Sequence, residues 1–111
     1  MKGHNMRNIT ELATRAFFNG DNFKLSNTEV HADCTGVYLY LFNNLIAKRV
    51  GERVSITLAG YNTLTTRERL NGILSKYNKR LTTKKGVVYI HDGETIKELP
   101  TDDKLRIISR D

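Results

Sequence analysis

The feature that most constrains the fold is residues 37–50, VYLYLFNNLIAKRV, where two β-rich runs flank an Asn-Asn pair. Asn43 and Asn44 can take the positive φ angles of a two-residue hairpin turn, so this stretch predicts two antiparallel strands. Such a turn makes these cross-strand pairs: Phe42 with Leu45, Tyr40 with Ala47, and Tyr38 with Arg49. One face of the hairpin would then be aromatic and edged with arginine. Apart from Lys48, the other would be aliphatic: Val37, Leu39, Leu41, Ile46 and Val50.

More strand patterns lie on both sides of this hairpin. Residues 51–52 can turn the chain again, and residues 54–58 then alternate between apolar and polar, which predicts the third strand of an antiparallel meander. Residues 87–91 and 95–99 flank Asp92-Gly93, a strong signal for a second hairpin. Weaker extended segments are predicted at residues 23–25, 28–32 and 105–108.

An amphipathic helix is predicted between the meander and the second hairpin. Thr65 and Glu68 have the spacing of a capping box, which places the start of the helix at Thr65. Asn78 is a plausible end, because asparagine accepts the left-handed conformation. Gly72 indicates either the close approach of another backbone or tolerance on the solvent face. One apolar stripe at helical spacing faces a core: Leu70, Ile73, Leu74 and Tyr77.

The N-terminal region predicts a loose segment followed by a short helix. Residues 1–8 are polar, and Asn8 or Thr10 can cap a helix that ends near residues 19–22. Its apolar residues recur at helical spacing: Leu12, Ala13, Ala16 and Phe17. The expected fold class is therefore α+β, with an N-terminal helix, an antiparallel β-meander, an amphipathic helix and a C-terminal β-hairpin. The length of 111 residues suffices for one modest core, so residues 9–111 are expected to pack as one small domain.

Cysteine content and hydropathy point to the cytoplasm. The sole cysteine, Cys34, excludes an internal disulfide and fits a reducing compartment. No apolar run approaches the ~18 residues of a membrane span, and the N-terminus lacks the apolar segment of a signal peptide. We therefore expect a cytoplasmic protein without a membrane partner, and the oligomeric state stays open.

Positive charge is concentrated in one part of the chain. Residues 67–85 contain a single acid, Glu68, and their local balance of +6 equals the net charge of the whole chain. The seven basic residues are Arg67, Arg69, Lys76, Lys79, Arg80, Lys84 and Lys85. In one reading they are a solvated surface that partly complements a helix dipole. In the other they bind the phosphate backbone of nucleic acid without reading sequence, because no base-reading motif is present.

A second candidate binding face is the aromatic side of the first hairpin, with Tyr38, Tyr40 and Arg49. Exposed aromatics on neighbouring strands can stack unpaired bases, with arginine on the phosphates. Burial of this face under a helix is the expected outcome, because sheets with helices available usually bury both apolar faces.

No residue pattern supports catalysis or a cofactor. His31, Asp33 and Cys34 lie close together in sequence and His91 and Asp92 are distant, but a lone His-x-x-Cys spacing is not a metal framework. A phosphate-binding glycine loop, a paired-carboxylate motif and a nucleophile elbow are all missing from the sequence. We therefore predict a non-catalytic protein with no cofactor and no metal.

Four segments resemble small uncharacterised proteins encoded by tailed bacteriophages: NLIAKR at residues 44–49, GYNT at 60–63, TTRERLN at 65–71 and KKGVVY at 84–89. Those proteins often carry an aromatic residue after the glycine, as Tyr61 does here, and tryptophan near position 88, where this chain has Val88. The resemblance implies a phage accessory protein that acts in the cytoplasm of an infected bacterium. It brings no activity or catalytic residue with it.

Two functional hypotheses from different classes follow. The protein binds nucleic acid non-specifically through its basic residues, or it is a protein–protein inhibitor or adaptor whose basic surface docks on an acidic host protein. Both hypotheses use the same charges.

Overall fold

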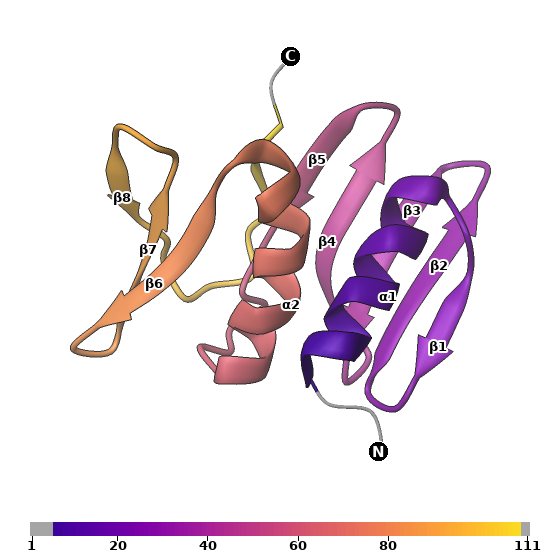
Figure 1. Cartoon of the computed structure of the whole chain (residues 1–111), viewed down its shortest axis with the longest axis horizontal. Coiled ribbons are helices and arrows are strands. Elements are labelled where there is room, and N and C mark those ends of the chain that lie inside the picture. The colour runs from indigo at the N-terminus through magenta and orange to yellow at the C-terminus, as the bar shows by residue number, and fades with distance from the viewer. Residues whose placement is uncertain (1–5, 110–111) are drawn as a thin grey trace.

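Two antiparallel sheets of unequal size and two helices make up the structure, a computed structural model that describes residues 6–109 (Figure 1). The helices are α1 (Met6–Asn19) and α2 (Leu64–Leu74), and α2 continues into the 3-10 turn η1 (Ser75–Tyr77). The larger sheet has the order β1 (Phe23–Leu25), β2 (Thr28–Asp33), β3 (Gly36–Leu41), β4 (Asn44–Val50), β5 (Arg53–Ile56) and β9 (Arg106–Ile107). The smaller sheet has the order β6 (Arg80–Lys84), β7 (Val87–His91) and β8 (Ile96–Glu98).

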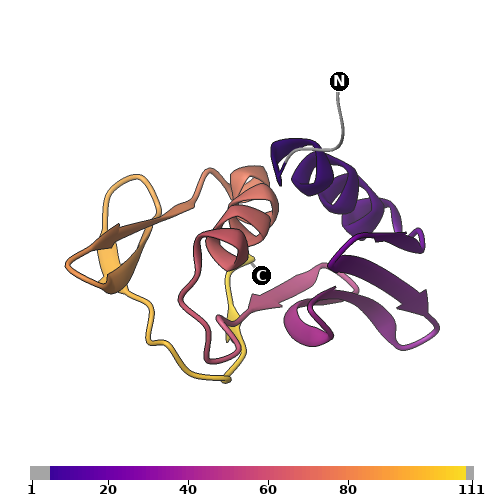
Figure 2. The same cartoon turned by 90° about the horizontal axis from the view of Figure 1, so that it is seen from below.

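Both helices lie on the same side of the larger sheet, and its opposite face is open (Figure 2). The α+β class, the N-terminal helix and the antiparallel meander are confirmed. The sequence prediction missed β6, which pairs with β7 and turns the expected C-terminal hairpin into a three-stranded sheet. Within residues 6–109, no helix is long and apolar enough to cross a membrane.

Helix α1 begins earlier than predicted. It starts at Met6, so residues 6–8 of the segment expected to be loose are helical, and neither Asn8 nor Thr10 is the cap; residues 1–5 lie outside the described part of the chain. The end is as predicted, because Gly20 follows Asn19 with φ 77° and its N–H reaches back to the Ala16 carbonyl at 2.9 Å.

The β3–β4 turn lies one residue earlier than predicted. Phe42 and Asn43, with φ of 50° and 67°, form the turn, which pairs Tyr40 with Leu45. Together with one extra residue further along β4, the earlier turn pairs Tyr38 with Lys48 and not with Arg49. The register shifts between Leu39 and Tyr40, where β4 carries one extra residue, a β-bulge. Because of the bulge, two successive residues, Ile46 and Ala47, are buried, and Lys48 points away from the helices.

The same shift places Arg49 on the helix-covered face. Its Nε donates to the Phe17 carbonyl at 3.1 Å and its Nη2 to the Phe18 carbonyl at 3.4 Å, so it satisfies carbonyls at the end of α1. Arg49 therefore joins β4 to α1. The predicted pairing of Arg49 with the aromatic face is wrong.

Helix α2 is capped two residues before the predicted position. Thr63 is the N-cap, and its Oγ1 accepts from the Thr66 N–H at 3.1 Å. The Thr66 hydroxyl lies 2.8 Å from Thr63 Oγ1, so threonine takes the place that Glu68 was predicted to have. The predicted end is confirmed, since Asn78 is left-handed with φ 59°.

The apolar stripe of α2 is confirmed as core. Leu70, Ile73 and Leu74 are fully buried, and Tyr77 packs against the same cluster. This cluster of buried residues continues into the smaller sheet through Leu81. A Cβ on Gly72 would lie 2.5 Å from Thr10 Cγ2 and would also collide with Thr14 of α1. Of the two explanations for Gly72, tolerance on the solvent face is wrong, and the close approach is made by threonine side chains of α1, with the Thr10 carbonyl oxygen at 3.6 Å.

Candidate nucleic-acid interface

The seven basic residues do not form one patch, because the fold buries one of them. Arg69 is only 2% exposed. Its Nε donates to Thr28 Oγ1 on β2 and its Nη1 to Thr10 Oγ1 on α1, both at 2.9 Å. Burial lowers the pKa of this guanidinium. Arg69 thus joins α2 to α1 and β2, and its prediction as a binding residue is wrong on grounds of access.

Two lysines are partly engaged near the end of α2. Lys76 Nζ lies 5.0 Å from the centroid of the Phe18 ring, a cation–π distance that holds it toward α1. Lys79 Nζ donates to the Ile108 carbonyl at 2.7 Å, which ties it to the C-terminal segment. Both keep their charge at or near the surface, but their main contacts are structural.

The strand β6 places two further cations on one face. Arg80 and Lys84 are four residues apart, so their side chains point to the same side of the strand, about 13 Å apart along it. Lys85 follows in the tight turn to β7, with φ of 51° there and 81° at Gly86. All three side chains are exposed. We call Arg80, Lys84 and Lys85 the basic hairpin.

The basic hairpin is held against α2 by one asparagine. Asn71 Oδ1 accepts from the Leu81 N–H at 2.6 Å, and its Nδ2 donates to the Leu81 carbonyl at 3.5 Å. Leu81 is buried, so the alternation of the strand directs Arg80 outward.

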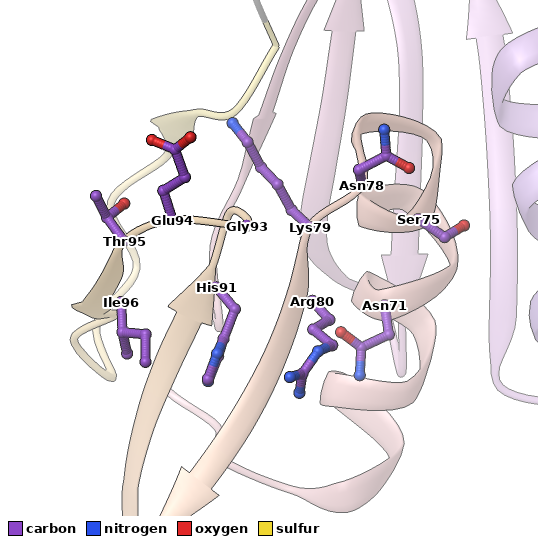
Figure 3. A pocket seen from close by; sticks show the side chains of 10 residues that line it. All are labelled: Asn71, Ser75, Asn78, Lys79, Arg80, His91, Gly93, Glu94, Thr95 and Ile96. Atoms are coloured by element: carbon purple, nitrogen blue, oxygen red, sulfur yellow. The ribbon is translucent and has the colours of Figure 1, made fainter.

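A cleft opens where Arg80 leaves β6. It has a volume of about 540 Å³. Figure 3 shows Arg80 and His91 pointing the same way from neighbouring strands, with Asn71 beside Arg80. His91 Nε2 lies 2.6 Å from Thr82 Oγ1, which orients the ring. Ten residues line the cleft: Asn71, Ser75, Asn78, Lys79, Arg80, His91, Gly93, Glu94, Thr95 and Ile96. Amide, hydroxyl and guanidinium donors of this kind can hold an anionic oxygen.

A second group of polar residues meets at the other end of β6. Arg67 Nη1 donates to Asn62 Oδ1, and Asn62 Nδ2 donates to the Gly86 carbonyl at 3.0 Å. Asn62 therefore links the first turn of α2 to the turn of the basic hairpin. The seven predicted residues are thus sorted into one buried arginine, two lysines near the end of α2, the basic hairpin, and Arg67 beside its turn.

The second candidate face is also divided by the fold. Tyr38 and Tyr40 lie on the open face of the larger sheet and are half-buried, so the expectation that a helix covers them is wrong. Arg49 projects from the opposite face, as described above. Tyr38 pairs with Lys48 on β4 and with His31 on β2, and Tyr40 pairs with Glu29 on β2. The open face is therefore mixed in charge.

The residues considered for metal binding do not converge. His31 Nε2 lies 3.2 Å from Asp33 Oδ2, and Cys34 is exposed, whereas His91 belongs to the other sheet. The hydroxyl and N–H of Thr35 lower the pKa of Asp33 through hydrogen bonds. Among the described residues, no three His, Cys, Asp or Glu side chains gather as a metal site.

Asn62 and Asn71 were missed as parts of a site, and His91 was considered only for metal binding, because isolated polar residues carry no periodic signal. β6 did carry a signal. Thr82 and Thr83 are β-branched and stand just before the Lys85-Gly86 turn, which is the pattern of a hairpin strand.

Comparison with known proteins locates the chain in one family. No curated protein and no solved structure matches it. The family model described as Kyanoviridae Gp96 protein matches residues 6–106, nearly the whole chain. This agrees with the resemblance to small proteins of tailed phages, and it carries no activity. The chain belongs to the Kyanoviridae Gp96 protein family of tailed cyanophages.

Proposed function

We propose that this phage protein binds nucleic acid through the phosphate backbone, without reading sequence and without catalysis. The basic hairpin is the main contact, with Arg67 and Lys79 at its two ends. The proposed place of action is the cytoplasm of the infected host.

One observation carries the proposal. Among residues 6–109, none of the six accessible basic side chains forms an ion pair with a carboxylate. They are Arg67, Lys76, Lys79, Arg80, Lys84 and Lys85. Cations that are not paired with a carboxylate attract polyanions over a distance, and each phosphate contact then releases counterions.

Sequence-independent binding fits the shape of this surface. Cations on a strand and its turn contact phosphates, which position a protein but carry no base information. Affinity should therefore be similar for unrelated sequences and should fall steeply with salt.

The test is a salt titration of nucleic-acid binding, followed by fluorescence anisotropy, with the triple variant Arg80→Gln, Lys84→Gln, Lys85→Gln. The matched control replaces three exposed cations elsewhere, Arg15, Lys24 and Lys104, by glutamine, so both variants lose the same charge. The slope of log K against log salt should fall by about 0.9 for each lost contact on duplex and about 0.7 on single strands.

The control variant should keep a slope close to that of the wild type. Equal slopes for the two variants would mean that only net charge matters, and the basic hairpin would not be the site. Absence of binding by the wild type at low salt would end the nucleic-acid proposal.

A second candidate function is docking on an acidic host protein, and one feature favours it. Val50, Leu105 and Ile107 are exposed apolar residues on the open side of the larger sheet. They surround a hollow of about 750 Å³, and its other lining residues are Lys48, Glu52, Arg53 and Ser55. Apolar residues rimmed by polar and charged groups are typical of a protein interface.

The two candidates are separated by capture from host lysate with and without nuclease. A partner that survives nuclease and is lost with Val50→Asp favours docking, whereas a partner released by nuclease favours nucleic acid. Val50 lies next to the β4–β5 turn and is 46% exposed, so this substitution should leave the fold intact.

A further inference from the structure

A small apolar pocket lies between the β3–β4 turn and the start of α2. Its volume is about 240 Å³, below the ~300–1,000 Å³ of pockets for drug-sized ligands. The floor is made by buried Leu41, Ile46 and Leu58. Two exposed aromatic residues also line it, Phe42 at 65% and Tyr61 at 53% exposure. A pocket of this size and lining suits one small planar group.

Phe42 stands in a backbone conformation that a bulky residue rarely adopts. Its φ is 50°, at a turn position where asparagine or glycine is preferred. The turn is anchored, because the Phe42 N–H donates to the Asn27 carbonyl at 2.8 Å. A large ring held in solvent at an unfavourable φ does nothing for the core, which makes a binding role for the ring the better explanation.

Polar groups at the pocket can recognise the edge of a heterocycle. Asn44 and Thr63 line it, but the Thr63 hydroxyl caps α2 through Thr66. Asn44 Nδ2 makes a longer bond, 3.3 Å, to the Phe42 carbonyl, so its amide is the group that can turn toward a ligand. An amide next to aromatic side chains is a usual means of holding a base by its edge while the rings hold its face.

Positive charge reaches the same end of the molecule. Asn62 stands in the chain between Tyr61 and Thr63, two residues that line the pocket, and it bonds both Arg67 and the Gly86 carbonyl in the turn of the basic hairpin. Figure 1 shows the β3–β4 turn, the start of α2 and the β6–β7 turn all at the lower end of the molecule. Lys84 and Lys85, next to Gly86, are therefore at the same end of the molecule as the pocket.

We infer that this pocket holds one unpaired base of a single-stranded nucleic acid, stacked against Phe42 and Tyr61, while Arg67, Lys84 and Lys85 contact the adjoining phosphates. The inference rests on the proposed function and narrows its ligand from any nucleic acid to single strands. Paired bases keep their faces inside the duplex stack, so a duplex offers only its backbone to the protein.

The test compares three probes of equal length by fluorescence anisotropy: a single-stranded oligonucleotide, an abasic oligomer with the same phosphates, and a duplex. The variants are Tyr61→Ala and Phe42→Asn, and asparagine is chosen because it accepts the positive φ of the turn. Leu64→Ala is the matched control. Leu64 is 62% exposed and follows Thr63 in the sequence, but it does not line the pocket.

We expect the wild type to prefer the single strand over the abasic oligomer. Each ring substitution should lower single-strand affinity by about 5- to 150-fold, the range measured for one base stacked on one aromatic residue. Affinity for the abasic oligomer and the salt slope should stay unchanged, and Leu64→Ala should behave as wild type.

Two results would overturn the inference, and only one of them would also contradict the proposed function. If the wild type binds the single strand and the abasic oligomer equally, or if ring substitutions weaken both alike, the pocket takes no base but phosphate binding survives. If neither probe binds at low salt, the proposed function fails together with the inference. Thermal melting of each variant checks that the fold is intact.

Discussion

The arginines packed between the helices and the larger sheet differ from the arginine on the smaller sheet. On the helix-covered side of the larger sheet, Arg49 donates to carbonyls at the end of α1, and Arg69 is buried among the hydroxyls of Thr10 and Thr28. On the smaller sheet, Arg80 stays at the surface with no carboxylate partner among the described residues. The first arrangement stabilises the contacts between elements. The second leaves charge available for a ligand.

The contrast is sharpest within α2 itself. Arg67 and Arg69 are two residues apart, which turns their side chains about 200° from each other on a helix. One faces Asn62 at the surface, and the other enters the space between α1 and β2. Neighbours in a basic run can therefore serve stability and binding separately.

The largest expected effect compares the buried stripe of α2 with an exposed side chain of the smaller sheet. Leu70→Ala should lower the free energy of unfolding by about 2–4 kcal/mol, because a fully buried side chain is lost and a cavity remains. Ile96→Ala on β8, where the side chain is 62% exposed, should cost less than about 0.5 kcal/mol. Urea denaturation measures both losses, and similar values would contradict the place of Leu70 in the core.

The two arginines of α2 give the next largest difference. Arg69→Met should cost about 2–3 kcal/mol, because the buried hydroxyls of Thr10 and Thr28 lose a charged donor. Arg67→Met loses one bond near the surface and should cost at most about 1 kcal/mol. Urea denaturation measures both losses. A larger loss for Arg67→Met than for Arg69→Met would contradict the assignment of Arg69 as the arginine that stabilises the fold.

The start of α2 offers a smaller effect. Thr63→Ala should cost about 1 kcal/mol by removing the hydroxyl that accepts from the Thr66 N–H. Thr65→Ala lies inside the first turn and should change stability by less than about 0.5 kcal/mol. If Thr65→Ala lowers the unfolding midpoint more than Thr63→Ala does, the helix is capped at Thr65 as the sequence predicted.

The smallest effect concerns the segment that leads from the smaller sheet back to the larger one. Arg106 Nη1 and Nη2 donate to Asp102 at 2.8 and 2.9 Å, and this pair is the main reason that the pKa of Asp102 falls from its ordinary 3.8 to about 2. Because the folded pKa is the lower one, the pair adds stability above pH ~4, and this contribution is lost as the pH falls toward 2.

Melting temperatures of the wild type and Asp102→Asn, taken across this pH range, measure the contribution. The difference between the two proteins should be present at neutral pH and disappear near pH 2. A difference that stays constant with pH would show that the carboxylate charge is not involved.

Predictions that depended on local chemistry were the most successful. The Asp92-Gly93 hairpin, the end of α2 at Asn78 and the apolar stripe of α2 are confirmed. Each depends on residues within one turn or one helical repeat, where backbone preference and periodicity decide the outcome. The β3–β4 register failed for two reasons: Phe42 takes the positive φ of the turn against its backbone preference, and a bulge at Ile46 adds one residue to β4, which no local pattern records.

The sequence by itself determined the fold class, the order of most elements, the concentration of positive charge and the kinship with small phage proteins. These follow from composition, period and turn residues, which act along the chain. Only the tertiary structure decided that Arg69 is buried, that Tyr38 and Tyr40 face outward, and that Phe42 and Tyr61 share one pocket. These are contacts between distant segments, and they are set by which faces the packing of two helices on one side of a sheet leaves uncovered.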